Sequence, residues 1–121
     1  MSKFLEALNE RVLLCDGAVG TRVQAMTLDL AADFLGQENC TEILNRSRPD
    51  LVRAIHRSYL EAGCDVVQTN SFGGSPITLG EFELADAAPE LNRRAAELAR
   101  EVLEEFAFDG RPRLCAQSAC R

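Results

Sequence analysis

Three short apolar runs, each followed by polar or small residues, predict the strands of this chain. They are residues 12–15, 66–67 and 114–116. The first run is apolar on both faces, which is typical of a strand buried in a parallel sheet. Asp16-Gly17 follows the first run, and Gln68-Thr69-Asn70 follows the second.

Helical spacing of apolar residues predicts two long helices between these strands. The first is expected to have Ser47 as its N-cap and Pro49 in its first turn, and to stop at Gly63. The second starts near Pro89, and its Glu90 and Arg94 have the spacing of an ion pair. The two apolar faces contain Leu51, Val52, Ile55, Tyr59 and Ala62, and Leu91, Ala95, Leu98, Val102 and Phe106.

Weaker patterns predict short helices over residues 2–10, 21–26 and 75–82, the first capped by Ser2. Asp109-Gly110 predicts a turn. Residues 36–48 are polar and are predicted to form a loop. The whole connection over residues 17–48 is long for a compact domain, which is typical of a functional loop.

The order strand, helix, strand, helix, strand predicts an α/β fold with parallel strands and right-handed crossovers. Ligands of such folds bind at the carboxyl ends of strands, so Asp16-Gly17 and Thr69-Asn70 are expected at one edge of the sheet. Three strands are too few to close a barrel. We therefore expect the N-terminal part of a larger domain, and a small complete α/β domain is the alternative.

Composition and charge exclude several classes of protein. The 121 residues are 46% hydrophobic and 26% charged, which is typical of a globular domain. The formal net charge of −6 argues against nucleic acid or an anionic membrane as the main partner. The chain has no apolar run near the ~20 residues of a membrane-spanning helix and no signal-peptide pattern, so a cytoplasmic protein is expected.

The first candidate ligand-binding motif is Asp16-Gly17-Ala18-Val19-Gly20-Thr21. Its acid could bind an ammonium group while the glycines let the backbone approach a ligand. A cradle for an anion and a plain tight turn are the alternatives. The small and amide side chains of residues 68–75 fit either a small polar ligand or a capped loop.

The histidine and the cysteines give weaker signals. His56 is expected on the outer face or the flank of the first long helix, away from the strand ends. The five cysteines, at positions 15, 40, 64, 115 and 120, are irregularly spaced and include no Cys-x-x-Cys pair. This spacing favours neither a disulfide framework nor a zinc site within the chain. Cys15 and Cys64 are expected to be small core residues.

Several segments together resemble the homocysteine S-methyltransferase domain. The most specific match is residues 59–73, YLEAGCDVVQTNSFG. The other matching segments are residues 13–21, 39–44, 48–52 and 90–92. The resemblance runs from about Arg11 to Arg113 and is greatest to the cobalamin-dependent members of the family.

The resemblance implies that residues 1–121 form a partial homocysteine-binding domain, about the first three units of a (β/α)8 TIM barrel. It implies that Asp16, with Gly17 beside it, helps to hold the substrate amino group and that Thr69 and Asn70 lie near the substrate. In the family a zinc ion holds the homocysteine thiolate. Its ligands lie on later segments, and none of the five cysteines here matches them. Residues 116–121 also depart from the Gly-Pro-containing loop that usually follows the third strand.

The function implied by the resemblance is methyl transfer to the zinc-bound thiolate of homocysteine, which gives methionine. In cobalamin-dependent members the methyl group arrives on methylcobalamin, so the implied partners are downstream methyltetrahydrofolate- and cobalamin-binding modules. This chain alone is then expected to be inactive. The alternatives are a methyltransferase with a sulfonium donor, one fused to a reductase, and a non-enzymatic α/β domain that binds a ligand or partner.

Overall fold

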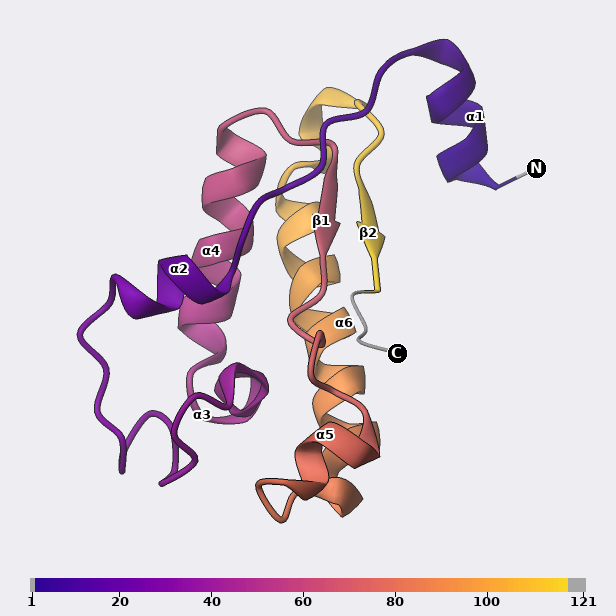
Figure 1. Cartoon of the computed structure of the whole chain (residues 1–121). Coiled ribbons are helices and arrows are strands. Elements are labelled where there is room, and N and C mark those ends of the chain that lie inside the picture. Colours follow the sequence, from indigo (N-terminus) through magenta and orange to yellow (C-terminus); the bar gives the residue numbers. More distant parts are fainter. Residues whose placement is uncertain (1, 118–121) are drawn as a thin grey trace.

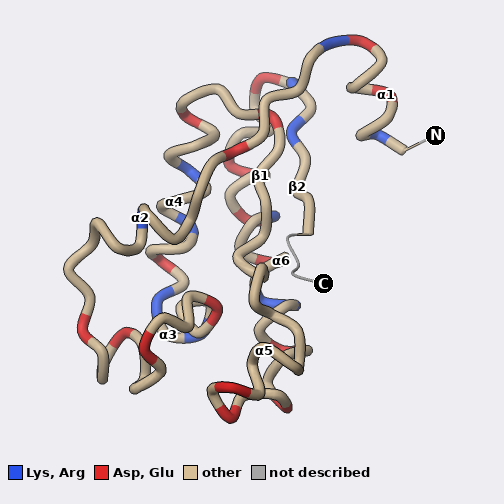
Figure 2. The backbone as a smooth tube through the Cα atoms, in the orientation of Figure 1, with Lys and Arg blue, Asp and Glu red and all other residues tan. Residues whose placement is uncertain are grey.

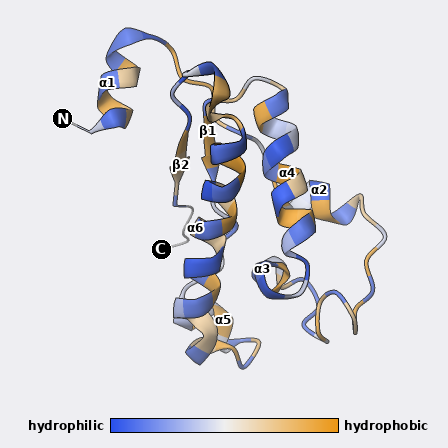
Figure 3. Ribbon diagram, turned by 180° about the vertical axis from the view of Figure 1, so that it is seen from behind, coloured by the Kyte–Doolittle hydropathy of each residue, from blue (hydrophilic) through white to orange (hydrophobic). Residues whose placement is uncertain are grey.

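The computed structural model describes residues 2–117 and contains a two-stranded parallel sheet with long helices on one face (Figure 1). Strands β1 (Val66–Gln68) and β2 (Leu114–Ala116) pair in parallel, with Val67 opposite Cys115. Helices α4 (Pro49–Glu61) and α6 (Ala88–Glu105) lie behind the sheet in Figure 1 and in front of it in Figure 3. The predicted parallel α/β arrangement is confirmed.

The other helices are short. They are α1 (Lys3–Glu10), α2 (Gly20–Gln24), η1 (Thr41–Ile43), α3 (Leu44–Ser47), α5 (Pro76–Gly80), η2 (Ala85–Ala87) and η3 (Ala107–Asp109). The hydroxyls of Ser2 and Ser75 accept hydrogen bonds from backbone N–H groups and cap α1 and α5. No helix in the described residues is both long and apolar enough to cross a bilayer.

Apolar clusters join the helices to the sheet. Val67 of β1 packs with Leu60 of α4 and with Ala99 and Val102 of α6. A second cluster joins α2, α3, α4 and α6 through Val23, Leu44, Val52, Ile55 and Leu98. A third joins η1, α5 and α6 through Cys40, Ile43, Leu79, Ala88 and Leu91. Both acidic and basic residues lie along α4 and α6 (Figure 2).

The first predicted strand is only partly formed. Cys15 makes an isolated parallel bridge to Val66, and the Asp16 N–H donates to the Val66 carbonyl at 2.9 Å. The expectation that this run is buried on both faces is wrong, since Val12 is 82% and Leu14 56% exposed. Neither residue belongs to the three apolar clusters of the described residues. Cys15 is also exposed and Cys64 half-buried, so neither is the core residue expected.

The prediction of a loop over residues 36–48 is wrong. The segment contains η1 and α3, and its Cys40, Ile43 and Leu44 are almost completely buried. These helices are three and four residues long, too short for apolar spacing to show a period. Ser47 ends α3 and donates to the carbonyl oxygens of Asp33 and Ile43 instead of capping α4.

The expected ion pair between Glu90 and Arg94 does not form. Glu90 instead accepts hydrogen bonds from Arg46 on α3, at 2.8 Å and 3.2 Å. Arg94 donates to Glu97 and Glu101 of its own helix. For Glu90, the contact with another helix therefore takes precedence over the local i to i+4 pair, which stabilises a helix only weakly.

One buried carboxylate joins the amino ends of all three strand segments. Asp65, which is 1% exposed, accepts hydrogen bonds from Arg11 at 2.9 Å and from the Leu14 N–H at 2.9 Å. It also accepts two from Arg111, which precedes β2. Burial alone would raise the pKa of Asp65, but the Leu14 N–H and the two guanidinium groups outweigh burial and lower it. Asp65 is therefore charged at neutral pH.

The prediction that His56 lies on the outer face or the flank of α4 is wrong, because the residue is only 1% exposed. Neither of its ring nitrogens has a hydrogen-bond partner among the described residues. Burial disfavours the charged imidazolium and lowers the pKa of His56 to about 4. The helix must therefore fold around a neutral histidine.

This burial predicts that His56 destabilises the fold in acid. Between pH 6.5 and about 4 the unfolded chain binds a proton that the folded chain excludes, so stability is full above pH 6.5 and falls as pH decreases. The pKa difference corresponds to about 3 kcal/mol. Urea unfolding of the wild type and His56→Leu from pH 7.5 to 4 tests this. The difference in free energy of unfolding between the wild type and His56→Leu should change by that amount over this pH range. Parallel pH profiles of the two proteins would show that His56 is accessible to protons in the folded chain.

Candidate functional site

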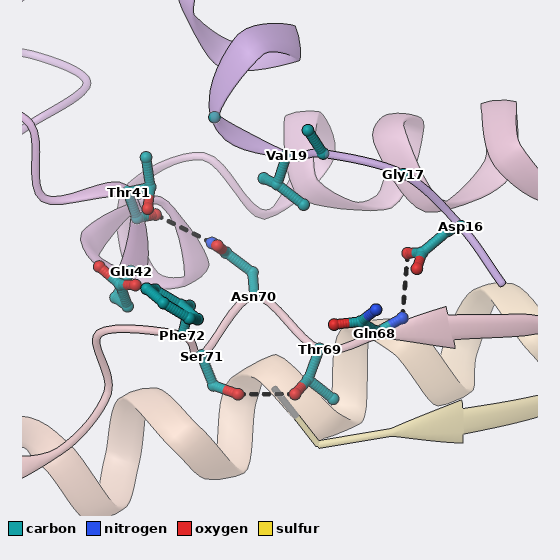
Figure 4. Close-up of a pocket in the computed structure, with 12 residues that line it drawn as sticks. Asp16, Gly17, Val19, Thr41, Glu42, Gln68, Thr69, Asn70, Ser71 and Phe72 are labelled. Atoms are coloured by element: carbon teal, nitrogen blue, oxygen red, sulfur yellow. Dashed lines mark hydrogen bonds between the residues drawn. The ribbon is translucent and has the colours of Figure 1, made fainter. Parts of the chain in front are cut away.

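A cavity of about 510 Å³ lies at the carboxyl ends of the strand segments (Figure 4). Three parts of the chain line it: residues 16–20 after the first strand segment, Thr41 and Glu42 of η1, and residues 68–72 at the end of β1. The four residues singled out in the sequence, Asp16, Gly17, Thr69 and Asn70, are thus brought together in one cavity. The volume fits a small metabolite.

Asp16 has one carboxylate oxygen engaged and one unpaired. Its Oδ2 accepts a hydrogen bond from the Gln68 N–H at 3.0 Å, which fixes the carboxylate against the end of β1. Its Oδ1 is buried and has no partner among the described residues. Burial raises the pKa of Asp16, and the bond from Gln68 only partly opposes this effect. An unpaired buried carboxylate oxygen is costly unless a donor or a cation is supplied, so Asp16 is suited to bind one.

Thr69 and Asn70 are 5% exposed and brace the loop that follows β1. The Thr69 and Ser71 hydroxyls lie 2.6 Å apart and share a hydrogen bond. The Asn70 side-chain amide donates to the Thr41 carbonyl at 2.9 Å and to the Asn45 side chain at 3.0 Å. These bonds tie the floor of the cavity to η1 and α3 and hold its shape.

Glu42 is a second acid in the cavity, in addition to the residues predicted from the sequence. It is 7% exposed, and its Oε1 accepts a hydrogen bond from the Gly73 N–H at 2.7 Å. A Cβ at position 73 would lie 3.0 Å from the same oxygen, so the loop can approach Glu42 this closely because residue 73 is glycine. The available sequence signal was an acid among the apolar residues Cys40, Ile43 and Leu44.

The charges around the cavity favour a cationic group. Asp16 and Glu42 are its acids, and none of the described lining residues is Lys or Arg. The other lining groups are neutral, and Phe72, which is 63% exposed, adds an aromatic ring beside Glu42. A small molecule with an ammonium group and an apolar part matches this lining.

The described residues do not fit a zinc site. No group of three or more His, Cys, Asp and Glu residues within residues 2–117 has the arrangement needed to hold a metal ion. Cys15 and Cys115 are exposed and Cys40 is buried in an apolar cluster. Cys120 lies outside the described residues.

Comparison with known proteins gives one consistent family. The family model described as homocysteine S-methyltransferase matches residues 13–120. The methionine synthase of Mycobacterium tuberculosis is 45% identical over 109 residues, which are 90% of this chain and 9% of that protein. The methionine synthase of Mycobacterium leprae is 48% identical over 102 residues, 84% of this chain and 8% of that protein.

Two solved structures share the fold. Both are crystal structures of the homocysteine methyltransferase MmuM from Escherichia coli. The oxidized form has a TM-score of 0.78 at 27% identity and covers 98% of this chain and 41% of that chain. The metallated form has a TM-score of 0.75 at 25% identity and covers 94% of this chain and 40% of that chain.

The raised pKa of Asp16 predicts that its charge destabilises the folded chain. Above the usual Asp pKa the unfolded chain loses this proton more readily, so stability falls as pH rises through the raised pKa. Asp16→Asn keeps an acceptor for the Gln68 N–H without the charge, and should be more stable than the wild type at pH 7 in urea unfolding. Asp86→Asn, at an exposed position on η2, is the control. If Asp16→Asn is less stable than the wild type, the charge of Asp16 does not destabilise the folded chain.

Proposed function

The chain belongs to the homocysteine S-methyltransferase family, and we propose that it forms the first part of the homocysteine-binding domain of a methionine synthase. Identities of 45% and 48% to two methionine synthases support this proposal. The chain spans only 9% and 8% of the length of those two proteins. That it takes part in methionine synthesis is therefore our proposal.

We propose that residues 1–121 contribute about three βα units of a TIM barrel. Three observations support this: the Cys15 bridge and β2 flank β1 in parallel, α4 and α6 cover one face, and the cavity lies at the carboxyl ends. Units of a barrel have this layout, with helices outside the sheet and the ligand site at the carboxyl edge.

The unpaired oxygen of Asp16 carries the proposed binding role. We infer that Asp16 Oδ1 accepts a hydrogen bond from the ammonium group of homocysteine, with Gly17, Thr69 and Asn70 around it. A charge-assisted bond of this kind gives the cavity a preference for an amino acid over an uncharged thiol. Asn70 contributes by holding the floor of the cavity, since its amide already donates to Thr41 and Asn45.

Methyl transfer requires the thiolate, because a free thiol with a pKa near ~8.5 is mostly protonated at neutral pH. The family uses zinc for this purpose, and the described residues do not fit a zinc site. We therefore propose that the zinc ligands lie outside this chain and that the chain alone is inactive. The proposed methyl source is methylcobalamin, bound and remethylated from methyltetrahydrofolate by further modules. A sulfonium donor is the second candidate for the methyl source.

Binding of L-homocysteine to the 121-residue chain tests the proposal. NMR titration should show shifts at Asp16, Gly17 and Gln68. 4-Mercaptobutyrate, which lacks the amino group, should bind at least about tenfold more weakly because it cannot make the charge-assisted bond. Asp16→Asn should lower homocysteine affinity by a similar factor but should not weaken the binding of 4-mercaptobutyrate, because that anion makes no bond to Asp16 and is repelled by its charge. Equal binding of the two thiols by the wild type would refute the role of Asp16.

A further inference from the structure

We propose that Tyr59 is a positioning residue for the candidate cavity. Tyr59 does not line the cavity but lies on α4, behind the loop of residues 17–20 that forms one wall. We infer that its hydroxyl fixes the conformation in which this loop presents its backbone and Asp16 to a ligand. The identity of that ligand rests on the proposed function, whereas the contact itself does not.

The hydroxyl and the ring of Tyr59 both contact the loop. Tyr59 Oη donates a hydrogen bond to the Ala18 carbonyl at 2.8 Å. A Cβ at position 17 would lie 3.0 Å from Tyr59 Oη and 3.2 Å from its Cε1. The backbone at Gly17 therefore approaches the ring as closely as a residue without a side chain allows, which gives this glycine a packing reason as well as a place in the cavity.

A second contact holds the far end of the same loop. The guanidinium group of Arg22, on α2, lies over the Tyr59 ring, 5.5 Å from its centroid. Arg22 also donates to the Ser58 hydroxyl at 3.0 Å, and Ser58 in turn donates to the Ile55 carbonyl at 2.7 Å. Two adjacent residues of α4 thus hold the loop on both sides of residues 19–20.

The bond to Ala18 sets the direction of the next peptide group. The C=O and N–H of a trans peptide point in opposite directions, and no cis peptide occurs in the described residues. Holding the Ala18 carbonyl toward α4 therefore turns the Val19 N–H away from α4. Without the hydroxyl, the peptide could rotate, because no regular structure fixes the chain between Asp16 and α2. Loss of this order would raise the entropy cost of binding.

Tyr59→Phe separates positioning from packing, since the ring stays and only the hydroxyl is lost. In hydrogen exchange of the ligand-free chain, the Asp16 and Val23 amides, which hold the two ends of the loop by hydrogen bonds to the Val66 and Val19 carbonyls, should exchange about fivefold faster, while amides within α4 and α6 keep wild-type rates. The affinity for L-homocysteine should fall by about fivefold as well. Unchanged loop exchange and unchanged affinity would overturn the proposal, and would leave Tyr59 a packing residue.

Two further variants sharpen the test. Arg57→Gln, on the same helix, removes the ion pair to Glu105 on α6 and should change neither loop exchange nor affinity. Gly17→Ala should loosen the loop, because its new methyl group meets the Tyr59 ring. In the double variant with Tyr59→Phe, the loss of homocysteine affinity should be smaller than the sum of the losses in the two single variants. Additive effects would contradict a shared contact. If the wild type fails to bind homocysteine, the proposed function fails, and the loop exchange rates still decide the role of Tyr59.

Discussion

The buried carboxylate of Asp65 is the constraint on which the arrangement of the strands depends. It binds Arg11 and the Leu14 N–H on the first strand segment and Arg111 just before β2. A buried charge of this kind must be paired to be tolerated, and here its partners come from two parts of the sequence that are both distant from Asp65. Pairing Asp65 therefore requires the three segments to lie side by side with their amino ends level.

Level amino ends place the carboxyl ends of the segments at one edge, where the cavity lies. There the polar groups are braced against the helices rather than left to the loops. Asn70 is tied to η1, Glu42 to Gly73, and Ala18 to Tyr59 of α4. Asp16 differs from these residues because one of its oxygens has no partner in the described chain. The rigid surroundings and this one open acceptor together give the cavity its preference for a cationic group.

Patterns that extend over many residues were sufficient to predict the two long helices and the edge of the sheet at which the cavity lies. Apolar spacing with proline and glycine at the ends located α4 and α6, and the polar strand ends located Asp16 and Asn70. Residues 36–48 were misread because helices of one turn show no period. The burial of His56 was missed for a different reason: it depends on how α4 packs, which no local pattern records.

Hydrogen exchange of Asp65→Asn tests the central role of this carboxylate most directly. Losing one partner of a buried ion pair costs roughly 3 kcal/mol, so the amides of Asp16, Val66 and Leu114 should exchange about 100-fold faster than in the wild type. Glu105→Gln, which weakens an ion pair on the helix surface, should leave them unchanged. Wild-type protection of all three amides in Asp65→Asn would show that the strands align without this carboxylate and would contradict the account.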